Sequence, residues 1–414
     1  MSKEERRVPE LRFKGFFEDW EQRELGDLAD KLEYGLNASA TDFDGENKYL
    51  RITDIDDDTH KFKMDNLTSP YIDIPSSDHY LLKPGDLLFA RTGASVGKTY
   101  LYNERDGKVY FAGFLIRAKI LSENNPQFIF QNTLTKKYLN FIRVMSQRSG
   151  QPGVNANEYA KYKIVVPKNN EQKKIGVLLE LIDNIITLHL RKINILKNLK
   201  QQYLRVMFVE NEKNTPKIRF KSFKDVWRQI RLKEISAKVK EKNTNNYYNN
   251  TLTNSAELGI LLQNNYFEKE IANAKNLTGY YIVKPDDFVY NPRISSHAPV
   301  GPIKKNNLDI TGIMSPLYYV FRTNSVDNSY LEKYFESTYW HRFMKYNGDT
   351  GARSDRFSIK DSVFTDMPIP YPSIKEQNEI GSFFNKLDDA ISLHQSKLSI
   401  LEQLKQSYLR KIFL

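Results

Sequence analysis

The segment from Gly93 to Thr99 comes closest to a motif that does chemistry, because Gly-Ala-Ser-Val-Gly-Lys-Thr resembles a loop that cradles phosphate. The spacing differs from such a loop. Thr92 stands where the first glycine belongs, and a strand-like Tyr-Leu-Tyr run follows instead of a helix. We therefore expect no nucleotide hydrolysis. The glycines instead permit a tight turn that carries Arg91, Ser95 and Lys98 towards an anion.

Other patterns typical of catalysis are weaker still. Asp86 with Asp106, Gly107 and Lys108 fits the carboxylate pattern of metal-dependent nucleases, but that pattern is common by chance and Asp-Gly favours a hairpin turn. The chain has no cysteine, and its 6 histidines show no ligand spacing, so no metal site is expected. The loops by which amino-methyltransferases hold a flipped base, Asn-Pro-Pro-Phe and Asp-Pro-Pro-Tyr, do not occur. The sequence predicts a chain without catalytic residues, metal or bound cofactor.

Charge and hydropathy narrow the class of partner. Lys and Arg total 62 against 51 Asp and Glu, a net charge of +11 over 414 residues, which favours an anionic partner such as nucleic acid or a membrane surface. No apolar run reaches the roughly 18 residues of a membrane span, and residues 2–7 are too polar for an export signal. We expect a soluble cytoplasmic protein that binds no membrane.

A long segment of the chain occurs twice. The stretch from Val166 to Phe208 recurs without a gap from Tyr371 to Phe413, and nearly half of the aligned positions are identical. A second match joins residues 9–25 to residues 216–232, through Arg-Phe-Lys and a tryptophan. The two halves of the chain therefore begin with similar segments and end with similar segments, while the residues between these segments differ. Such internal similarity predicts an architecture built by duplication.

The repeated segments carry an apolar stripe with a period of seven, which predicts long coiled-coil helices. The stripe runs through Ile175, Ile182, His189, Leu196 and Tyr203 in the first copy and through Ile380, Leu387, His394, Leu401 and Tyr408 in the second. Ser373 followed by Glu376 predicts a capping box at the start of the second helix. Because each stripe must be buried, we expect the two helices to pack against each other in antiparallel fashion.

His189 and His394 lie at the midpoints of the two repeated segments. Two helices of equal length that run antiparallel place their midpoints opposite each other, so these histidines are expected to meet at the centre of the seam. A polar residue at a core heptad position fixes register and orientation at a cost in stability. The alternative is two unrelated, partly exposed histidines.

The divergent interiors predict two modules of another kind. Tyr, Phe, Ile and Val alternate there with Asn, Gly, Pro and Asp, which favours short strands and turns. Strands are expected within 49–55, 86–91, 108–120 and 316–322, and helices near 126–147 and 328–346. The expected fold is therefore two α/β (α+β) modules of mainly antiparallel character, residues 1–165 and 215–370, separated by helical spacer regions at 166–214 and 371–414, with an internal pseudo-twofold duplication.

Two compact modules on long helices, in a basic chain without catalytic motifs, suggest a protein that reads two features of double-stranded DNA. Basic and polar residues in turns would contact phosphates and base edges, where Arg pairs with guanine and Asn or Gln with adenine. The candidates are Arg91, Thr92, Ser95, Lys98, Arg143, Gln147, Arg148 and Gln151 in the first module, and Asn291, Arg293, Ser295, Ser296, His297, Arg353, Ser354 and Arg356 in the second. For each of them a solvated surface side chain is the competing interpretation.

The whole chain resembles the specificity subunit of type I restriction-modification systems. The resemblance rests on the matching ends of the two halves, the loop from Arg91 to Gly97, the Gly-Ala-Arg segment at 351–353 and above all the repeated Pro, Glu-Gln, Ile, Leu-Lys, Tyr-Leu, Phe helix. It implies two target recognition domains, each of which reads one half of a split asymmetric DNA site, and paired helices that set the length of the unread spacer between them.

The resemblance also implies partners. The helices would dock two modification subunits, which bind S-adenosylmethionine and methylate adenine N6, and restriction subunits would join through these. S-adenosylmethionine, Mg²⁺ and ATP are thus expected on partner subunits, and this chain on its own is expected not to be an enzyme. Four extra residues near Leu196 should lengthen the unread spacer. The alternative from another class is a coiled-coil scaffold that binds only proteins.

Overall fold

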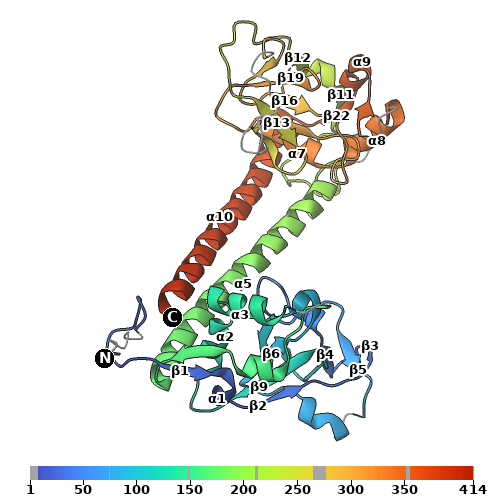
Figure 1. Ribbon diagram of the computed structural model, residues 1–414. Coiled ribbons are helices and arrows are strands. Elements are labelled where there is room, and N and C mark those ends of the chain that lie inside the picture. The colour runs from blue at the N-terminus through green and yellow to red at the C-terminus, as the bar shows by residue number, and fades with distance from the viewer. Residues whose placement is uncertain are drawn as a thin grey trace. The chain divides into compact units, whose positions relative to one another are not determined.

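The computed structural model describes residues 8–73, 75–147, 150–209, 213–263, 277–350 and 355–413. The chain forms two compact units, each of which combines one module with parts of both long helices. Unit 1 contains residues 1–192 and 394–414, and unit 2 contains residues 193–393. Both units mix helices with short strands, and the long helices α5 (Asn169–Val206) and α10 (Ile374–Ile412) contribute to each of them (Figure 1). The expected α+β fold with a coiled-coil helix pair is confirmed.

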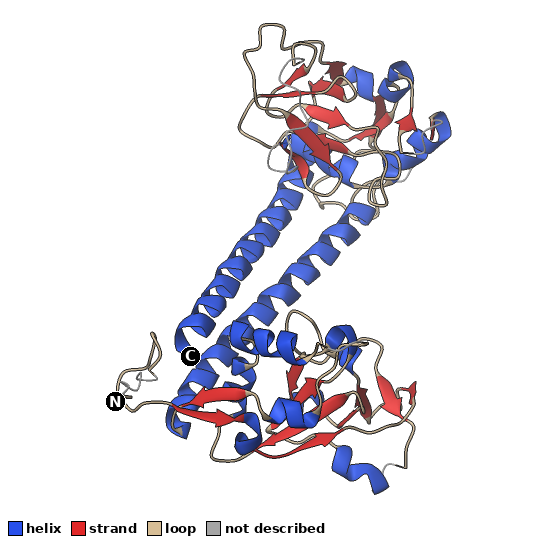
Figure 2. Cartoon of the chain, viewed as in Figure 1, coloured by secondary structure: helices blue, strands red, loops and turns tan. Residues whose placement is uncertain are grey.

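The first module is built around a four-stranded antiparallel sheet in the order β2-β9-β6-β7. Its helices α2 and α3 pack on this sheet (Figure 2), and their shared core includes Phe89, Phe128 and Tyr138. Its elements are β1 (Glu21–Glu24), α1 (Leu25–Leu28), β2 (Ala29–Tyr34), β3 (Ala40–Asp42), β4 (Lys48–Leu50), β5 (Thr68–Pro70), β6 (Asp86–Ala90), β7 (Thr99–Leu101), β8 (Val109–Phe111), β9 (Leu115–Ile120), α2 (Pro126–Asn132), α3 (Lys136–Met145), α4 (Ala156–Ala160) and β10 (Lys163–Val166), with 3-10 turns at Ile52–Asp54, Pro75–Tyr80, Gly93–Ser95 and Glu104–Asp106.

The second module repeats this topology. Its four-stranded sheet has the order β12-β19-β16-β17, and β11 pairs with β22 as β1 pairs with β10. Its elements are β11 (Arg228–Arg231), β12 (Ser236–Lys238), β13 (Leu252–Ser255), β14 (Gly259–Leu262), β15 (Tyr281–Val283), β16 (Phe288–Tyr290), β17 (Ile303–Lys305), β18 (Gly312–Met314), β19 (Tyr319–Thr323), α7 (Asn328–Glu336), α8 (Tyr339–Asn347), β20 (Asp349–Thr350), β21 (Phe357–Ser358), α9 (Asp361–Thr365) and β22 (Pro368–Tyr371), with a 3-10 turn at Leu232–Glu234. The interiors therefore share a fold that their sequences conceal.

Several expected elements have different bounds. Residues 49–55 form the end of β4 and a 3-10 turn, and residues 108–120 form two strands, β8 and β9. The helical stretches near 126–147 and 328–346 each divide into two helices, because a short turn after α2 and after α7 redirects the chain. The β4–β8 pair is parallel, whereas the other strand pairs among the described residues are antiparallel. The mainly antiparallel character is confirmed.

The long helices pack antiparallel within each unit. In unit 1 the start of α5, with Ile175 and Leu179, shares its core with Leu409 and Ile412 near the end of α10. In unit 2 the end of α5, at Leu204, shares its core with the start of α10. An α-helix of 38 residues, the length of α5, extends about 57 Å at roughly 1.5 Å per residue.

The repeated Glu-Gln pair explains why both the first segment and the long helix are similar in the two halves of the chain. In unit 1 Arg12 donates to Glu171 through Nε at 2.7 Å and Nη2 at 2.9 Å, and Gln172 Oε1 accepts the backbone N–H of Asn125 at the start of α2. In unit 2 Arg219 binds Glu376 at 2.6 and 2.8 Å. These carboxylates are almost fully buried. Each pair therefore ties the first segment of a module to the start of a long helix.

This arrangement corrects the expected capping box. Ser373 Oγ accepts the backbone N–H of Glu376 at 3.4 Å, so the serine caps the helix. The Glu376 carboxylate does not return to the cap, because it accepts hydrogen bonds from Arg219 and, at 3.1 Å, from Trp227 Nε1. A bidentate pair with a guanidinium is stronger than one neutral amide bond, so the carboxylate turns to the arginine.

Candidate nucleic-acid interface

The loop that follows β6 packs against the segment that precedes α4. The Gly93 N–H donates to the Pro152 carbonyl at 3.0 Å, and the Val154 N–H donates to the Arg91 carbonyl at 2.9 Å. Gly93 (φ +69°) and Gly97 (φ +86°) supply the left-handed conformations of the turn. The two candidate segments of the first module, widely separated in sequence, thus lie side by side. The strand β7 follows the loop, as the sequence predicts.

Arg91 is held between two aromatic rings. Its guanidinium carbon lies 5.0 Å from the Tyr34 ring centre and 5.8 Å from that of Phe114. Both rings are substantially exposed, at 43% and 55%. Among the described residues, no carboxylate forms an ion pair with Arg91. A guanidinium fixed by cation–π contacts keeps its N–H donors for a phosphate or for the O6 and N7 atoms of guanine.

The other candidate residues of the first module differ in whether their side chains are exposed or already bound to a neighbour. Lys98 pairs with Asp57 at 2.5 Å, so one of its donors is already engaged. Thr92 pairs with Gly153 in an isolated antiparallel bridge, and Ser95 is half-buried within the turn. Exposed side chains are found at Arg143 in α3, Gln147 and Gln151. Arg148 lies outside the described residues.

In the second module the loop that follows β16 pairs with the segment before β21. The Ile294 N–H donates to the Asp355 carbonyl at 3.0 Å, and the Phe357 N–H donates to the Pro292 carbonyl at 2.7 Å. Arg293 and Arg356 face each other in an antiparallel bridge, and both side chains are exposed. This pairing places two guanidinium groups on neighbouring backbones. Arg353 and Ser354 lie outside the described residues.

Polar side chains of this second loop shape the loop itself. Asn291 donates through Nδ2 to the Asn254 carbonyl at 2.9 Å and accepts the Arg293 N–H at 3.0 Å. Ser295 Oγ accepts the Ala298 N–H at 3.2 Å, and His297 Nδ1 lies 3.0 Å from a Glu257 carboxylate oxygen. Ser296 Oγ lies 3.3 Å from the same imidazole nitrogen. These contacts position the loop, and Arg293 and Arg356 are exposed beside it.

Sequence reasoning missed an apolar residue at the same turn of both modules. Phe114 precedes β9 and is 55% exposed, and Leu317 precedes the equivalent strand β19 and is 60% exposed. Leu317 lines a cavity of about 340 Å³ together with Lys238, Pro292, Arg356 and Phe357. Exposed large apolar side chains beside arginines suit contact with a thymine methyl group or a sugar. The sequence signal that could have identified them is an apolar residue in the turn before the equivalent strand of each half.

The nuclease-like carboxylate has a structural role. Asp86 is buried, its Oδ2 accepts the Lys83 N–H at 2.9 Å, and Arg117 Nη1 lies 3.4 Å away. Asp287 repeats these contacts with the Lys284 N–H and with Arg322. Burial raises the pKa of Asp86 despite the nearby arginine. Within the described ranges, no group of three or more His, Cys, Asp or Glu side chains is arranged to hold a metal ion.

The helix pair places the two seam histidines together. His189 Nδ1 and His394 Nδ1 lie 2.9 Å apart in unit 1, which is the contact expected from the repeat. One nitrogen must donate and the other accept, so both rings cannot be charged in this geometry. Burial, the neighbouring His189 and the lysines at 397 and 192 lower the pKa of His394. Whether the pair fixes the register of the helices stays a prediction.

Comparison with known proteins agrees with this architecture. The type I restriction modification DNA specificity domain matches residues 17–198. The putative type I restriction enzyme MjaX specificity subunit of Methanocaldococcus jannaschii is 25% identical, over 94% of this chain and 91% of the relative. The MjaVIII specificity subunit of the same organism is 21% identical over the same shares.

A solved structure shares the fold over nearly the full length. The S subunit of the type I restriction-modification system of M. genitalium superposes with a TM-score of 0.64 at 15% identity, and the match covers 98% of this chain and 99% of that one. Among the described residues, no helix is both long and apolar enough to cross a membrane. The repeated helices and the two modules of one topology agree with these matches, so this chain is similar over nearly its full length to the DNA specificity subunits of type I restriction-modification systems.

Proposed function

We propose that each module reads one half of a bipartite, asymmetric site in double-stranded DNA. The observation that carries the proposal is that two modules of one topology present different side chains at equivalent positions. Arg91 with two flanking aromatic rings occupies the loop after β6, whereas Arg293, Arg356 and a cavity occupy the region after β16. Two modules that share a topology but present different side chains at equivalent loops are suited to recognise two different half-sites.

The long helices would set the unread distance between the half-sites. Helices α5 and α10 are continuous over 38 and 39 residues, and an unbroken α-helix is a stiff element. A helical rise of about 1.5 Å per residue, against roughly 3.4 Å per base pair, makes helix length a measure of DNA length. We infer that spacer length follows from these two helices, and half-site sequence from the modules.

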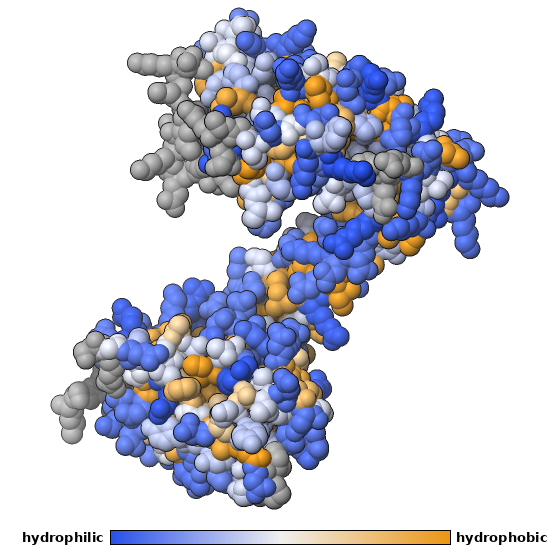
Figure 3. Space-filling view, turned by 90° about the vertical axis from the view of Figure 1, so that its right-hand side faces the viewer, coloured by the Kyte–Doolittle hydropathy of each residue, from blue (hydrophilic) through white to orange (hydrophobic). Residues whose placement is uncertain are grey.

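Exposed apolar side chains on the helices would dock two modification subunits. Leu188 and its repeat counterpart Leu393 are 64% and 54% exposed, and Ile195 and its counterpart Ile400 are 51% and 64% exposed. Apolar residues interrupt the otherwise hydrophilic surface of the chain (Figure 3). Such side chains on a helix favour a protein partner, and their duplication favours two identical partners. Native mass spectrometry of the assembled complex would count them.

The remaining partners follow from this docking. Restriction subunits would join through the modification subunits, which would carry S-adenosylmethionine, and Mg²⁺ and ATP would act on partner subunits in the cytoplasm. The matching domain and relatives are DNA specificity subunits, and this similarity supports DNA recognition over a scaffold that binds only proteins. A scaffold would also lack the steep salt dependence of DNA binding, where each neutralised phosphate contributes about −0.9 to the log-log slope.

Mapping of methylated adenines tests the proposal. In cells that carry this chain with its modification partner, we expect one split motif with two dissimilar halves. Arg91→Ala should relax or abolish recognition at one position of a single half, because one bidentate arginine contact discriminates by about 1–3 kcal/mol. Lys168→Ala is the matched control, since the Lys168 side chain forms an exposed pair with Glu18. An unsplit motif, or an Arg91 variant that changes both halves, contradicts the proposal.

A further inference from the structure

Two ion pairs join the long helices, one in each unit. In unit 1 Asp183 of α5 lies 2.6 Å from Lys405 of α10, measured from Oδ1 to Nζ. In unit 2 Lys200 of α5 lies 2.5 Å from Asp388 of α10. Asp183 and Asp388 are counterparts in the repeat, and so are Lys200 and Lys405. In each unit, therefore, the aspartate of one copy meets the lysine of the other.

Each ion pair is also bound by a third side chain, from a module helix. Gln131 of α2 donates to Asp183 Oδ2 at 2.6 Å in unit 1. In unit 2 the equivalent donor is Lys333 of α7, whose Nζ lies 2.7 Å from Asp388 Oδ2. The Asp–Lys pair therefore connects three elements in both units: α5, α10 and the helix that carries the module's core.

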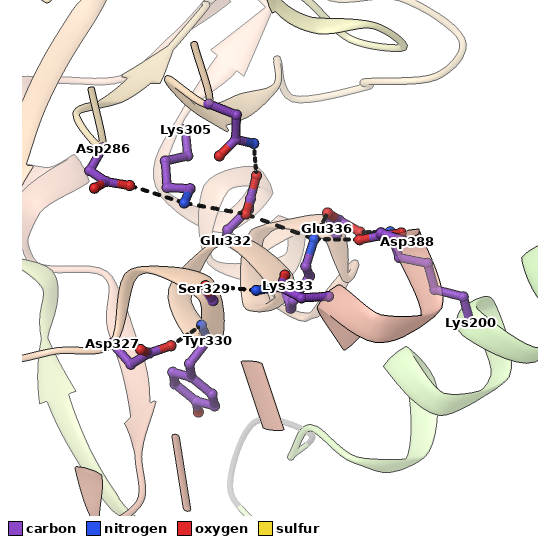
Figure 4. A network of polar contacts seen from close by, with 12 residues as sticks. Lys200, Asp286, Lys305, Asp327, Ser329, Tyr330, Glu332, Lys333, Glu336 and Asp388 are labelled. Carbon is purple, nitrogen blue, oxygen red and sulfur yellow. Dashed lines mark hydrogen bonds and ion pairs between the residues drawn. The ribbon is translucent and has the colours of Figure 1, made fainter. Parts of the chain in front are cut away.

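The unit 2 pair belongs to a larger network. Glu336 accepts from Lys200 at 2.6 Å and from Lys333 at 2.8 Å, and the sticks of α5, α7 and α10 converge at this point (Figure 4). Lys333 is buried, with 4% of its surface exposed. Although burial alone would raise it, hydrogen bonds from Lys200 and Lys333 hold the pKa of Asp388 below its ordinary value. Charges in a part-buried network lose hydration, and this costs free energy unless opposite charges lie in contact.

Apolar packing alone does not fix the register of such a helix pair. The stripes repeat every seven residues, so a slip by one heptad places apolar residues opposite apolar residues again. The ion pairs do not survive that slip. Asp183 would face Leu398 or Ile412, and Lys200 would face Gly381 or Gln395. A part-buried charge that loses its partner in a slipped register destabilises that register, and the effect grows with burial.

We propose that the pairs Asp183–Lys405 and Lys200–Asp388 select the register of the helix pair and so act as positioning residues for spacer length. The inference rests on the proposed role of the helices in setting the spacer. It assigns the choice between registers to charges on either side of the histidine contact: in each copy the aspartate lies six residues before the seam histidine and the lysine eleven residues after it. The third side chain ties that register to a module.

The test measures spacer discrimination by the assembled methyltransferase. Once the methylated motif is known, duplexes carry both half-sites with the native spacer or with one base pair more or less, and methylation rates are compared. Lys405→Asp sets two like charges against each other, and we expect the preference for the native spacer to fall at least about tenfold, the factor that corresponds to roughly 1.4 kcal/mol. The double variant Asp183→Lys with Lys405→Asp should restore it, because Gln131 Oε1, which has no partner within the described residues, can accept from the new lysine.

The second unit supplies the matched control. Asp388→Lys with Lys200→Asp would set the new lysine against Lys333, so this exchange should fail to restore discrimination. Circular dichroism shows whether Lys405→Asp folds. If it does not, the double variant Lys405→Gln with Asp183→Asn is used in its place, because it removes both charges without creating a repulsion. Unchanged spacer preference in a folded single variant, or no restoration by the unit 1 exchange, overturns the inference. A wild-type complex without a split motif would instead contradict the proposed function.

Discussion

At the scale of single residues, partners decide what each polar side chain contributes. Arg91 combines exposure with two aromatic contacts, while Lys98 is engaged by Asp57. The histidines show the same dependence on surroundings. His394 meets His189 in the helix seam, and His341 packs against Trp340 with a ring separation of 4.5 Å. Residue type alone therefore does not separate contact residues from structural ones.

The histidines make stability depend on pH. Burial, with a smaller contribution from Lys345, lowers the pKa of His341 to about 4, and the pKa of His394 is lowered as well. Because the folded state holds these protons less tightly than the unfolded state, stability is complete above about pH 6.5 and falls as the pH drops towards 4. Thermal unfolding of wild type between pH 7.5 and 4.5 should show this loss.

A variant separates His341 from the carboxylates that titrate in the same range. His341→Gln removes the ionisable ring at this site, so its melting temperature should fall less between pH 7 and pH 5 than that of wild type. His297→Gln is the control, since His297 lies on the surface beside Glu257. An equal pH dependence in His341→Gln and wild type would show that His341 does not titrate on unfolding.

At the scale of elements, the repeated Glu-Gln pair joins each module to a long helix. The glycine that follows this pair in each copy lies at the same junction. A Cβ at Gly176 would lie 2.5 Å from Asn125 Oδ1, and one at the counterpart Gly381 would lie 2.8 Å from Asp327 Oδ1. The helix can approach the N-terminus of α2 or α7 only because no side chain intervenes. The pattern shared by the two copies thus marks the junction between a module and a long helix.

Loss of one arginine from this junction should destabilise the second module. Arg219→Ala leaves the Glu376 carboxylate buried, with 0% exposure, and with Trp227 Nε1 as its remaining side-chain donor among the described residues. We expect the free energy of unfolding to fall by about 3 kcal/mol, as for other buried ion pairs that lose one partner. Urea denaturation measures it.

The comparison is a surface pair in the same chain. Lys168→Ala, which breaks the exposed contact with Glu18, should cost less than about 1 kcal/mol. Arg219→Lys tests geometry, because an ammonium group cannot reproduce the two parallel bonds of the guanidinium and should recover only part of the loss. Equal stabilities for Arg219→Ala and Lys168→Ala would refute a role for the buried pair.

At the scale of the whole molecule, duplication leaves a shared frame with two different sets of contact loops. The sheets β2-β9-β6-β7 and β12-β19-β16-β17 are equivalent, and each is followed by the strand and long helix of the repeat. Four extra residues near Leu196, expected from the sequence to lengthen the spacer, would also move Lys200 away from Asp388 and so break the register of α5 against α10. A change of spacer length therefore needs both helices to change together.

Matched insertion of one heptad tests the spacer role. Seven residues added after Leu196 in α5 and seven added after Ile391 in α10 preserve both apolar stripes and should lengthen the helix pair by about 10 Å, or roughly three base pairs. Mapping of methylated adenines should then return the original half-sites with a longer spacer. Insertion into α5 alone serves as the control and should abolish specific methylation. A matched variant with altered half-sites would contradict the separation of roles.

The sequence by itself determined the duplication and the long helices, because a repeat and a seven-residue apolar period can be read from it directly, and it determined the histidine contact because two equal antiparallel helices place their midpoints opposite each other. It also predicted DNA contacts for the loops at Arg91 and Arg293, and these stay predictions. Only the tertiary structure decided which side chains meet there: Tyr34 and Phe114 reach Arg91 through strand pairing, and Asp183 meets Lys405 through helix packing. Such contacts join residues far apart in the chain, and their formation depends on the register of sheets and helices, which no local pattern encodes.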